Sequence, residues 1–163
     1  MIDKLSAKLF KNRKTKISYG DVQKQSVAIG RRIADGIKAG EIPADFQLAC
    51  ISRGGSIPAV IISNMLNKRP VKYLEIRSYN GDNRQGEIID ETPADYIDAA
   101  RPMIIIDDLY DTGATIRYIQ QKYPGALIAT LFYKTKNDGY KKLWHAGKKM
   151  PNVWLTFPWC PAI

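Results

Sequence analysis

Long apolar stretches are missing from this sequence of 163 residues. No segment approaches the roughly 18 uninterrupted apolar residues that a membrane-spanning helix needs. The lysine-rich start, residues 1–16, also lacks the apolar stretch of a secretory signal peptide. We therefore expect a soluble protein of the cytoplasm without a membrane span.

Cysteine and histidine are also scarce. Cys50 and Cys160 are the only cysteines; two are too few for a disulfide framework, and they lack the close spacing of a metal-binding pair. We expect both to be reduced thiols. His145 is the only histidine, and no serine or carboxylate partner for a catalytic triad can be identified. It is predicted to lie on the surface without a catalytic role.

Two common phosphate-binding motifs do not occur. The pattern Gly-x-x-x-x-Gly-Lys-Ser/Thr of nucleoside triphosphatases is missing, and so is the Gly-x-Gly-x-x-Gly fingerprint of dinucleotide-binding enzymes. A phosphate ligand would therefore have to be bound by a different arrangement of the chain.

What the sequence does contain is a core-forming composition with an excess of positive charge. Hydrophobic residues make up 45% and charged residues 25% of the chain, as in one soluble globular domain of ordinary size. The net charge of +9 implies anionic partners, and it does not separate phosphorylated small molecules from nucleic acid or a membrane surface. We expect a basic N-terminal segment, residues 1–17, followed by a single domain, residues 18–163.

Hydrophobic periodicity predicts strands that alternate with helices. Ser18 is a plausible helix N-cap, and Gly40 closes the helical pattern that follows it. Helices are predicted at residues 18–40, 57–66 and 115–123, and strands at 46–51, 71–76, 103–106 and 127–133. This alternation indicates an α/β fold, a mostly parallel central sheet flanked by helices, which binds ligands at the carboxyl ends of its strands.

The most distinctive segment, residues 107–115, reads Asp-Asp-Leu-Tyr-Asp-Thr-Gly-Ala-Thr. Its four last residues are small, and their backbone N–H groups can converge on a phosphate at a helix N-terminus. Asp107 and Asp108 would repel a phosphate, so we expect them to hold ribose hydroxyls or a Mg²⁺ ion that bridges to a further phosphate group. A sugar phosphate suits both halves. The alternative is an ordinary strand end with solvated aspartates, in which Thr112 only caps the next helix.

This segment resembles the signature of type I phosphoribosyltransferases, which bind 5-phosphoribosyl-1-pyrophosphate (PRPP) through two acidic residues followed by Asp-Thr-Gly-x-Thr. The resemblance implies that Asp107 and Asp108 contact the ribose hydroxyls and the metal shell, with Asp108 as the Mg²⁺ residue. It implies that Asp111 accepts or shares the N7 proton of a purine. The 5′-phosphate would be wrapped by Asp111, Thr112, Gly113, Ala114 and Thr115, where Ala114 replaces the commoner glycine.

The Ser-Arg-Gly-Gly run at residues 52–55 resembles the pyrophosphate-binding loop of the same family. Ser52, Arg53 and Gly54 would meet the departing diphosphate through backbone N–H groups and the guanidinium. Taken alone, the run also fits an ordinary strand-to-helix turn. The polar stretch 78–87 would be the flexible lid over PRPP, with Arg84 meeting the pyrophosphate.

From Ser18 to Trp159 the resemblance narrows to small bacterial-type xanthine-guanine enzymes of the 6-oxopurine branch, which share a Ser-Tyr loop and a Trp-x-x-x-Pro-Trp ending. It implies that Lys134 reaches the purine 6-oxygen, that Trp154 stacks on the ring, and that the backbone of Trp154 and Leu155 faces the 2-substituent in a small C-terminal hood. Lys134 could instead be one of many surface lysines.

The aromatic cluster of Trp154, Phe157 and Trp159 could instead clamp the core, which we expect for Phe157 and Trp159. Cys160 stands where the related enzymes tend to carry an aspartate.

The predicted activity is transfer of the phosphoribosyl group from PRPP, with Mg²⁺, to guanine, xanthine or hypoxanthine, which gives the nucleoside monophosphate and pyrophosphate. By analogy the chain would form dimers or tetramers. One alternative is a PRPP-binding regulator that binds RNA or DNA, which the charge permits; no helix-turn-helix or zinc module is evident, so a nucleic-acid partner is not favoured. Another is a phosphoribosyltransferase for a different base.

Overall fold

A computed structural model of the chain describes residues 14–79, 87–134, 142–147, 149–151 and 153–160. Its centre is a sheet of five parallel strands in the order β3-β2-β6-β7-β8. The bounds are β2 Gln47–Ile51, β3 Val71–Leu74, β6 Met103–Tyr110, β7 Leu127–Tyr133 and β8 Leu143–His145. The predicted fold class, a mostly parallel sheet flanked by helices, is confirmed.

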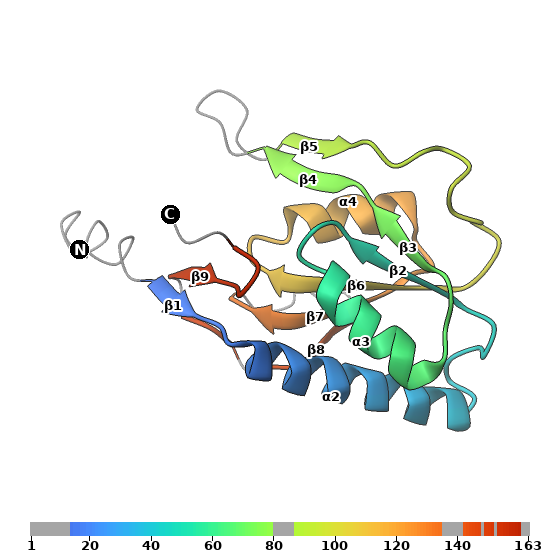
Figure 1. Cartoon of the computed structure of the whole chain (residues 1–163). Helices are drawn as coiled ribbons and strands as arrows, with labels where there is room; N and C mark the ends of the chain where they lie inside the picture. Colours follow the sequence, from blue (N-terminus) through green and yellow to red (C-terminus); the bar gives the residue numbers. More distant parts are fainter. Residues whose placement is uncertain (1–13, 80–86, 135–141, 148, 152, 161–163) are drawn as a thin grey trace.

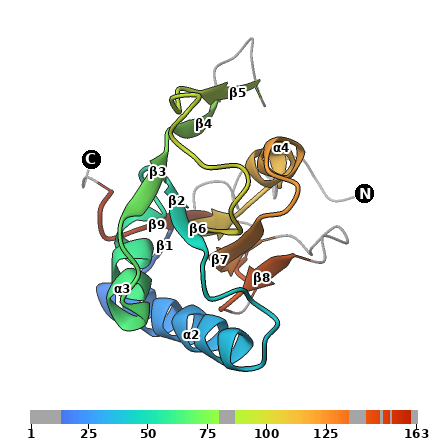
Figure 2. The ribbon, with the colours of Figure 1, turned by 90° about the vertical axis from the view of Figure 1, so that its right-hand side faces the viewer.

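The helices lie on both faces of this sheet (Figures 1 and 2). Their bounds are α2 Tyr19–Lys38, α3 Ser56–Leu66 and α4 Ala114–Lys122. The predicted helix start at Ser18 is confirmed by a capping box, in which the Ser18 hydroxyl accepts from the Asp21 N–H and the Asp21 carboxylate accepts from the Ser18 N–H. Among the described helices, none combines the length and apolar character needed to cross a bilayer.

Successive residues of β6 face opposite layers, which is why this strand is apolar throughout its first half. Ile104 and Ile106 pack in the cluster that α2 and α3 cover, whereas Ile105 packs in the cluster that includes Ile116 and Ile119 of α4. All five side chains are at most 2% exposed. Burial of each stabilises the fold by about 1.5–3 kcal/mol. The strand is therefore held rigidly from both sides, and so is the loop that follows it.

Two small sheets complete the fold. Strands β4 (Ile76–Tyr79) and β5 (Glu87–Asp90) pair in antiparallel fashion, and β1 (Lys14–Lys16) pairs in parallel with β9 (Trp154–Thr156). The lid prediction at residues 78–87 thus falls partly on paired strands, and residues 80–86 lie outside the described residues. The rest of the predicted basic segment, residues 1–13, lies outside them too, so the division at residue 17 stays a prediction.

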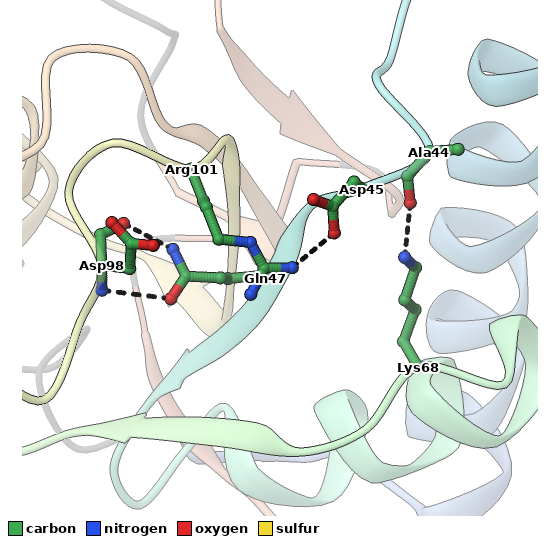
Figure 3. Close-up of polar contacts among 6 residues, drawn as sticks. All are labelled: Ala44, Asp45, Gln47, Lys68, Asp98 and Arg101. Carbon is green, nitrogen blue, oxygen red and sulfur yellow. Dashed lines mark hydrogen bonds and ion pairs between the residues drawn. The ribbon is translucent and has the colours of Figure 1, made fainter.

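The amino ends of the strands, opposite the predicted site, are held by polar contacts to the connecting segments (Figure 3). Gln47 is 5% exposed, and its side-chain amide donates to the Asp98 carbonyl at 2.7 Å and accepts from the Asp98 N–H at 3.2 Å. Arg101 forms an ion pair with Asp45 at 2.5 Å. These contacts fasten the long connection before β6 to the start of β2, so that β2 and β6 begin in register.

Candidate active site

The predicted site segments meet at the carboxyl ends of neighbouring parallel strands. Residues 52–55 connect β2 to α3, residues 107–113 run from β6 to α4, and Lys134 directly follows β7. Because β2, β6 and β7 are adjacent in the sheet, their ends lie side by side. One difference from the sequence prediction is that β6 does not end at Ile106. Asp107 and Tyr110 pair with Thr130 and Tyr133 of β7, so backbone pairing continues through the acidic residues.

The loop 52–55 packs directly against the acidic segment. A β-carbon on Gly54 would collide with the carboxylate of Asp108, and one on Gly55 would collide with the Ile106 carbonyl oxygen. The peptide bond between Ser52 and Arg53 is cis. Both glycines are therefore required by close approach of two loops, which an ordinary strand-to-helix turn would not need.

These two loops border a cavity of about 890 Å³. Ser52, Arg53 and Gly54 line this cavity together with Asp108; their assignment to PRPP stays a prediction. The C-terminal segment also reaches the cavity, since Trp159 and Cys160 line it. Trp159 stacks on Phe157 with ring centroids 4.9 Å apart. Phe157 is 5% exposed and packs in the core, as expected. Trp159 stacks on it and also lines the cavity.

Asp107 and Asp108 form a coupled acidic pair. The Asp107 carboxylate accepts from the Asp108 N–H at 2.9 Å and is nearly buried. Burial, together with the charge of Asp108, raises the pKa of Asp107 well above its usual range. Burial also raises the pKa of Asp108, to about 6. Two carboxylates that are costly to ionise together favour a bound cation or hydroxyl donors.

The donor set of this pair fits Mg²⁺, which binds through one or two carboxylates and takes its other ligands from substrate phosphates and water. Among the described residues, no three His, Cys, Asp or Glu side chains stand together as a complete metal site. Asp108 lines the cavity, and Asp107, the residue before it, is 9% exposed. An ion here would thus be completed by a phosphorylated ligand.

The segment after the acidic pair turns sharply into α4. Gly113 is the N-cap of this helix with a φ of 82°, in the left-handed region that favours glycine, and a β-carbon there would lie 2.7 Å from the Tyr110 hydroxyl oxygen. Within the described parts of the chain, no side-chain hydrogen bond caps this helix. The Thr112 hydroxyl is 3.4 Å from the Ala114 nitrogen, a long contact. This contact is too long for Thr112 to cap the helix well. The N-terminus of α4 is better suited to bind an anion.

Lys134 and Asp111 are brought together from different strands. The Lys134 ammonium lies 2.9 Å from Asp111 Oδ2, and the Lys134 N–H donates to the Tyr110 carbonyl at 2.9 Å. The Lys134 side chain is only 8% exposed, compared with 50% for Asp111. Lys134 is therefore not one of the solvated surface lysines. The ion pair joins Lys134, the predicted base-binding residue, to Asp111, the first residue of the predicted phosphate loop.

Trp154 and Leu155 occupy opposite environments on β9. The Trp154 side chain is 64% exposed, whereas Leu155 is 5% exposed and packs in the core. Strand β9 is held by its pairing with β1, where Lys14 is opposite Trp154. An indole this exposed contributes little to the core and can serve as a flat surface for a ring.

Known proteins with similar sequences match the part of the chain that contains these loops. A family model for the phosphoribosyl transferase domain matches residues 18–142. The chain belongs to the phosphoribosyltransferase family. It is 28% identical over 156 residues to a xanthine-guanine phosphoribosyltransferase of Ruegeria sp., covering 90% of this chain and 85% of the relative. A xanthine-guanine phosphoribosyltransferase of Idiomarina loihiensis is 25% identical over 150 residues, covering 91% and 88%.

Solved structures of phosphoribosyltransferases share the fold. A purine phosphoribosyltransferase from Pyrococcus horikoshii superimposes with a TM-score of 0.70 at 22% identity, covering 92% of this chain and 97% of that one. A xanthine-guanine-hypoxanthine phosphoribosyltransferase of Helicobacter pylori gives a TM-score of 0.64 at 22% identity, covering 90% and 94%. The prediction of a type I phosphoribosyltransferase related to the xanthine-guanine enzymes is confirmed.

His145 of this phosphoribosyltransferase is only partly exposed, which corrects the prediction of a plain surface position. It is partly buried in β8 and stacks on Tyr133 with ring centroids 4.4 Å apart. Its Nδ1 is 2.6 Å from the Thr130 hydroxyl, and burial lowers its pKa. The reason is that β8 pairs with β7 and places Thr130 opposite His145, which no local pattern in the sequence indicates.

Two further cations stand at the site and escaped the sequence analysis. Arg77 of β4 lines the cavity and pairs with Glu91 at 3.3 Å. Arg117 of α4 donates to the Thr112 carbonyl at 3.2 Å. The second could have been found, because side chains on a helix point toward its N-terminus. Arg84, which was predicted to meet pyrophosphate, lies outside the described residues.

Proposed function

We propose that this phosphoribosyltransferase transfers the 5-phosphoribosyl group from PRPP to a 6-oxopurine base, giving a nucleoside 5′-monophosphate and pyrophosphate in purine salvage. The observation that carries the proposal is the contact between Lys134 and Asp111, because it puts a buried ammonium at the edge of the loop for the donor. The names of the xanthine-guanine relatives support the same base class.

The donor end binds pyrophosphate and ribose. Ser52, Arg53 and Gly54 receive the diphosphate through backbone N–H groups and the guanidinium, next to the Asp108 carboxylate. Asp107 and Asp108 hold the ribose hydroxyls and the Mg²⁺ ion. When bound, Mg²⁺ supplies positive charge that stabilises the developing charge on the leaving diphosphate. Arg77 lines the same cavity and adds a positive charge near the diphosphate. The sequence predicted this role for Arg84.

The 5′-phosphate lies at the N-terminus of α4. Gly113 is the N-cap of this helix and no side-chain hydrogen bond caps it among the described residues; the first backbone N–H groups and the helix dipole favour an anion there. The phosphate-binding residues are Asp111, Thr112, Gly113, Ala114 and Thr115. A phosphate fixed at this point orients C1 of the ribose between the pyrophosphate loop and the base, which is the positional contribution to catalysis.

The acceptor end binds the base. Lys134 donates to the purine 6-oxygen; an ammonium has three N–H donors and no acceptor, so it can hold Asp111 and the 6-oxygen together and disfavours a 6-amino group. Trp154 stacks on the ring, and the backbone at Leu155 faces the 2-substituent. Stacking of this kind stabilises binding by about 1–3 kcal/mol.

The reaction exchanges one bond at C1 of the ribose. A ring nitrogen of the base bonds to C1 while the C1–O bond to pyrophosphate breaks. The ring proton moves to the Asp111 carboxylate and from there to solvent, which makes Asp111 the catalytic residue of the proposal. The half-exposed position of Asp111 suits both steps, since it faces the site and solvent.

We further propose that the chain is a cytoplasmic homo-oligomer, a dimer or a tetramer. Helix α3 is apolar along most of its sequence, and its Val60 is 45% exposed; Met65, which packs beside Gly30 of α2, is still 42% exposed. A helix with this pattern is normally covered. Light scattering of the purified protein tests the proposal, and a monomer at assay concentration would contradict it.

Pyrophosphate release with Mg²⁺, PRPP and each of guanine, xanthine and hypoxanthine tests the activity, with adenine as the 6-amino control. We expect turnover with at least one 6-oxopurine and little with adenine. No pyrophosphate with any of the three would refute the proposal. Turnover with another base alone would support a different acceptor, and RNA or DNA binding that falls steeply with salt, without turnover, would support a regulator.

A further inference from the structure

Arg117 lies one turn into α4, beside the loop that the proposed function assigns to the 5′-phosphate. Its Nη1 donates to the Thr112 carbonyl at 3.2 Å, and a β-carbon on Gly113 would lie 3.0 Å from the same nitrogen. Long side chains on a helix point back toward its N-terminus, so this reach is the favoured direction. The Arg117 side chain is exposed. Its guanidinium therefore stands at the open rim of the turn.

The negative charge that would gather at this turn when a phosphate binds favours a nearby cation. Asp107, Asp108 and Asp111 lie in the same segment, and a phosphate monoester adds about 1.5–2 negative charges at pH 7. The dipole of a helix supplies only about half a positive charge at its N-terminus. Lys134 approaches from the β7 side and contacts Asp111. Arg117 adds a full positive charge on the helix side.

The chemistry of the guanidinium also fits. Arginine presents five N–H donors in a planar fork that matches phosphate oxygens. One N–H group of Arg117 donates to the Thr112 carbonyl at the start of the turn. A guanidinium has five N–H donors, so the same group can also donate to a phosphate oxygen. The side chain both shapes the turn and supplies charge to it.

We propose that Arg117 is a further 5′-phosphate-binding residue of this chain, which contacts the phosphate from the α4 side. The inference rests on the proposed function and deepens its donor site. Arg117 lies two residues beyond Thr115, the last residue of the Asp-Thr-Gly-x-Thr pattern, so the motif does not contain it. PRPP and the nucleotide product share the 5′-phosphate, and both ligands should therefore depend on Arg117.

The test compares ligands with and without the 5′-phosphate on Arg117→Gln. We expect guanosine 5′-monophosphate to bind about 10- to 100-fold more weakly by titration calorimetry, the effect of one lost charge-assisted hydrogen bond. Guanosine, measured as a competitive inhibitor, should be unaffected, and so should the KM for the base. The KM for PRPP should rise with the loss of nucleotide affinity. Arg117→Lys should recover most of the loss, because it keeps the charge.

Arg31→Gln is the matched control, because Arg31 is also an exposed helical arginine and the change removes the same charge. It should leave both affinities unchanged, and the melting temperatures of all variants should agree. The inference fails if Arg117→Gln weakens guanosine as much as its monophosphate, if it binds the monophosphate like the wild type, or if Arg117→Lys binds the monophosphate no better than Arg117→Gln. Wild-type protein that releases no pyrophosphate would instead refute the proposed function, so the two failures are distinguishable.

Discussion

The two ends of the proposed site are built in different ways. The donor end consists of two continuous loops, 52–55 and 107–115, that contact each other through backbone and glycine, so closely that Gly54 has no room for a β-carbon beside Asp108. The acceptor end consists of single side chains: Lys134, which follows β7 of the central sheet, and Trp154 on β9, which belongs to another sheet. The donor end should thus tolerate change poorly throughout, whereas the acceptor end should respond to each side chain separately.

Gly54→Ala should give the largest effect. The added methyl group would force the pyrophosphate loop away from Asp108, and a displacement of about 1 Å at reacting groups costs about 100-fold in rate. We expect kcat/KM for PRPP to fall by at least this factor, with a loss of about 1–3 kcal/mol in stability from overpacking. Steady-state kinetics and denaturant unfolding measure the two.

Gly125→Ala is the control for this change, because a β-carbon at Gly125 would have no heavy atom of another described residue within 4 Å, apart from its two chain neighbours. It should leave activity and stability nearly unchanged. Full activity in Gly54→Ala would show that the two donor loops do not depend on close contact, and the contrast between the two ends would then be wrong.

Lys134→Ala should give the next largest effect, confined to the acceptor end. The variant loses a buried ammonium and the ion pair that it forms with Asp111. We expect kcat/KM for the base to fall by about 2–3 kcal/mol, or about 30- to 150-fold, with the KM for PRPP little changed. The preference for a 6-oxo over a 6-amino purine should narrow as well.

Lys142→Ala is its control, since the exposed Lys142 only donates to the Gly125 carbonyl at 3.1 Å, at the far ends of the strands. It should behave like the wild type in both kinetic constants. An equal rise of the KM for PRPP and for the base in Lys134→Ala would mean that Lys134 supports the whole site.

Asp90 should make the stability of the protein depend on pH at the donor end. Burial alone would raise its pKa, but hydrogen bonds from Lys122, Thr92 and Tyr118 outweigh burial and lower the pKa to about 2. A depressed carboxyl pKa contributes stability above the unfolded value near 3.8, and this contribution is lost as pH falls through about 2. The contact fastens β5 to α4, and therefore the hairpin with Arg77 to the phosphate turn.

Asp90→Asn should accordingly cost about 2 kcal/mol at pH 7, with the difference from wild type shrinking between pH 4 and pH 2. Denaturant unfolding across this range measures it. A difference that stays constant with pH would show that the carboxylate charge plays no part, and would remove the proposed link between the hairpin and α4.

The donor end could be predicted from the sequence because each of its loops is continuous, and a turn that must bind phosphate needs small residues in a fixed order. The partners from elsewhere could not. Arg77 lies on β4, which pairs with β5, and lines the cavity; His145 is partly buried because β8 pairs with β7. Strands of three or four residues carry too little periodicity to be recognised.

The main helices and strands were predicted within a few residues, since α2 and β7 have strong apolar patterns. The end of β6 was not, because its pairing with β7 continues through Asp107 to Tyr110 where side-chain polarity suggested a loop. The family resemblance was enough to suggest Lys134 as a base-binding residue. Its contact with Asp111 follows from the pairing of β6 with β7, which the sequence did not reveal.

Trp154→Ala should give the smallest effect and sharpens the comparison most. The indole is 64% exposed, so its removal should leave the melting temperature unchanged while base affinity falls by about 1–3 kcal/mol, the contribution of one stacked base. Trp154→Phe should keep part of that affinity. Leu155→Ala, on the same strand but 5% exposed, should do the reverse and cost about 2–5 kcal/mol of stability. If Trp154→Ala destabilised the protein and left base affinity unchanged, Trp154 would be a structural residue, and the acceptor end would rest on Lys134 alone.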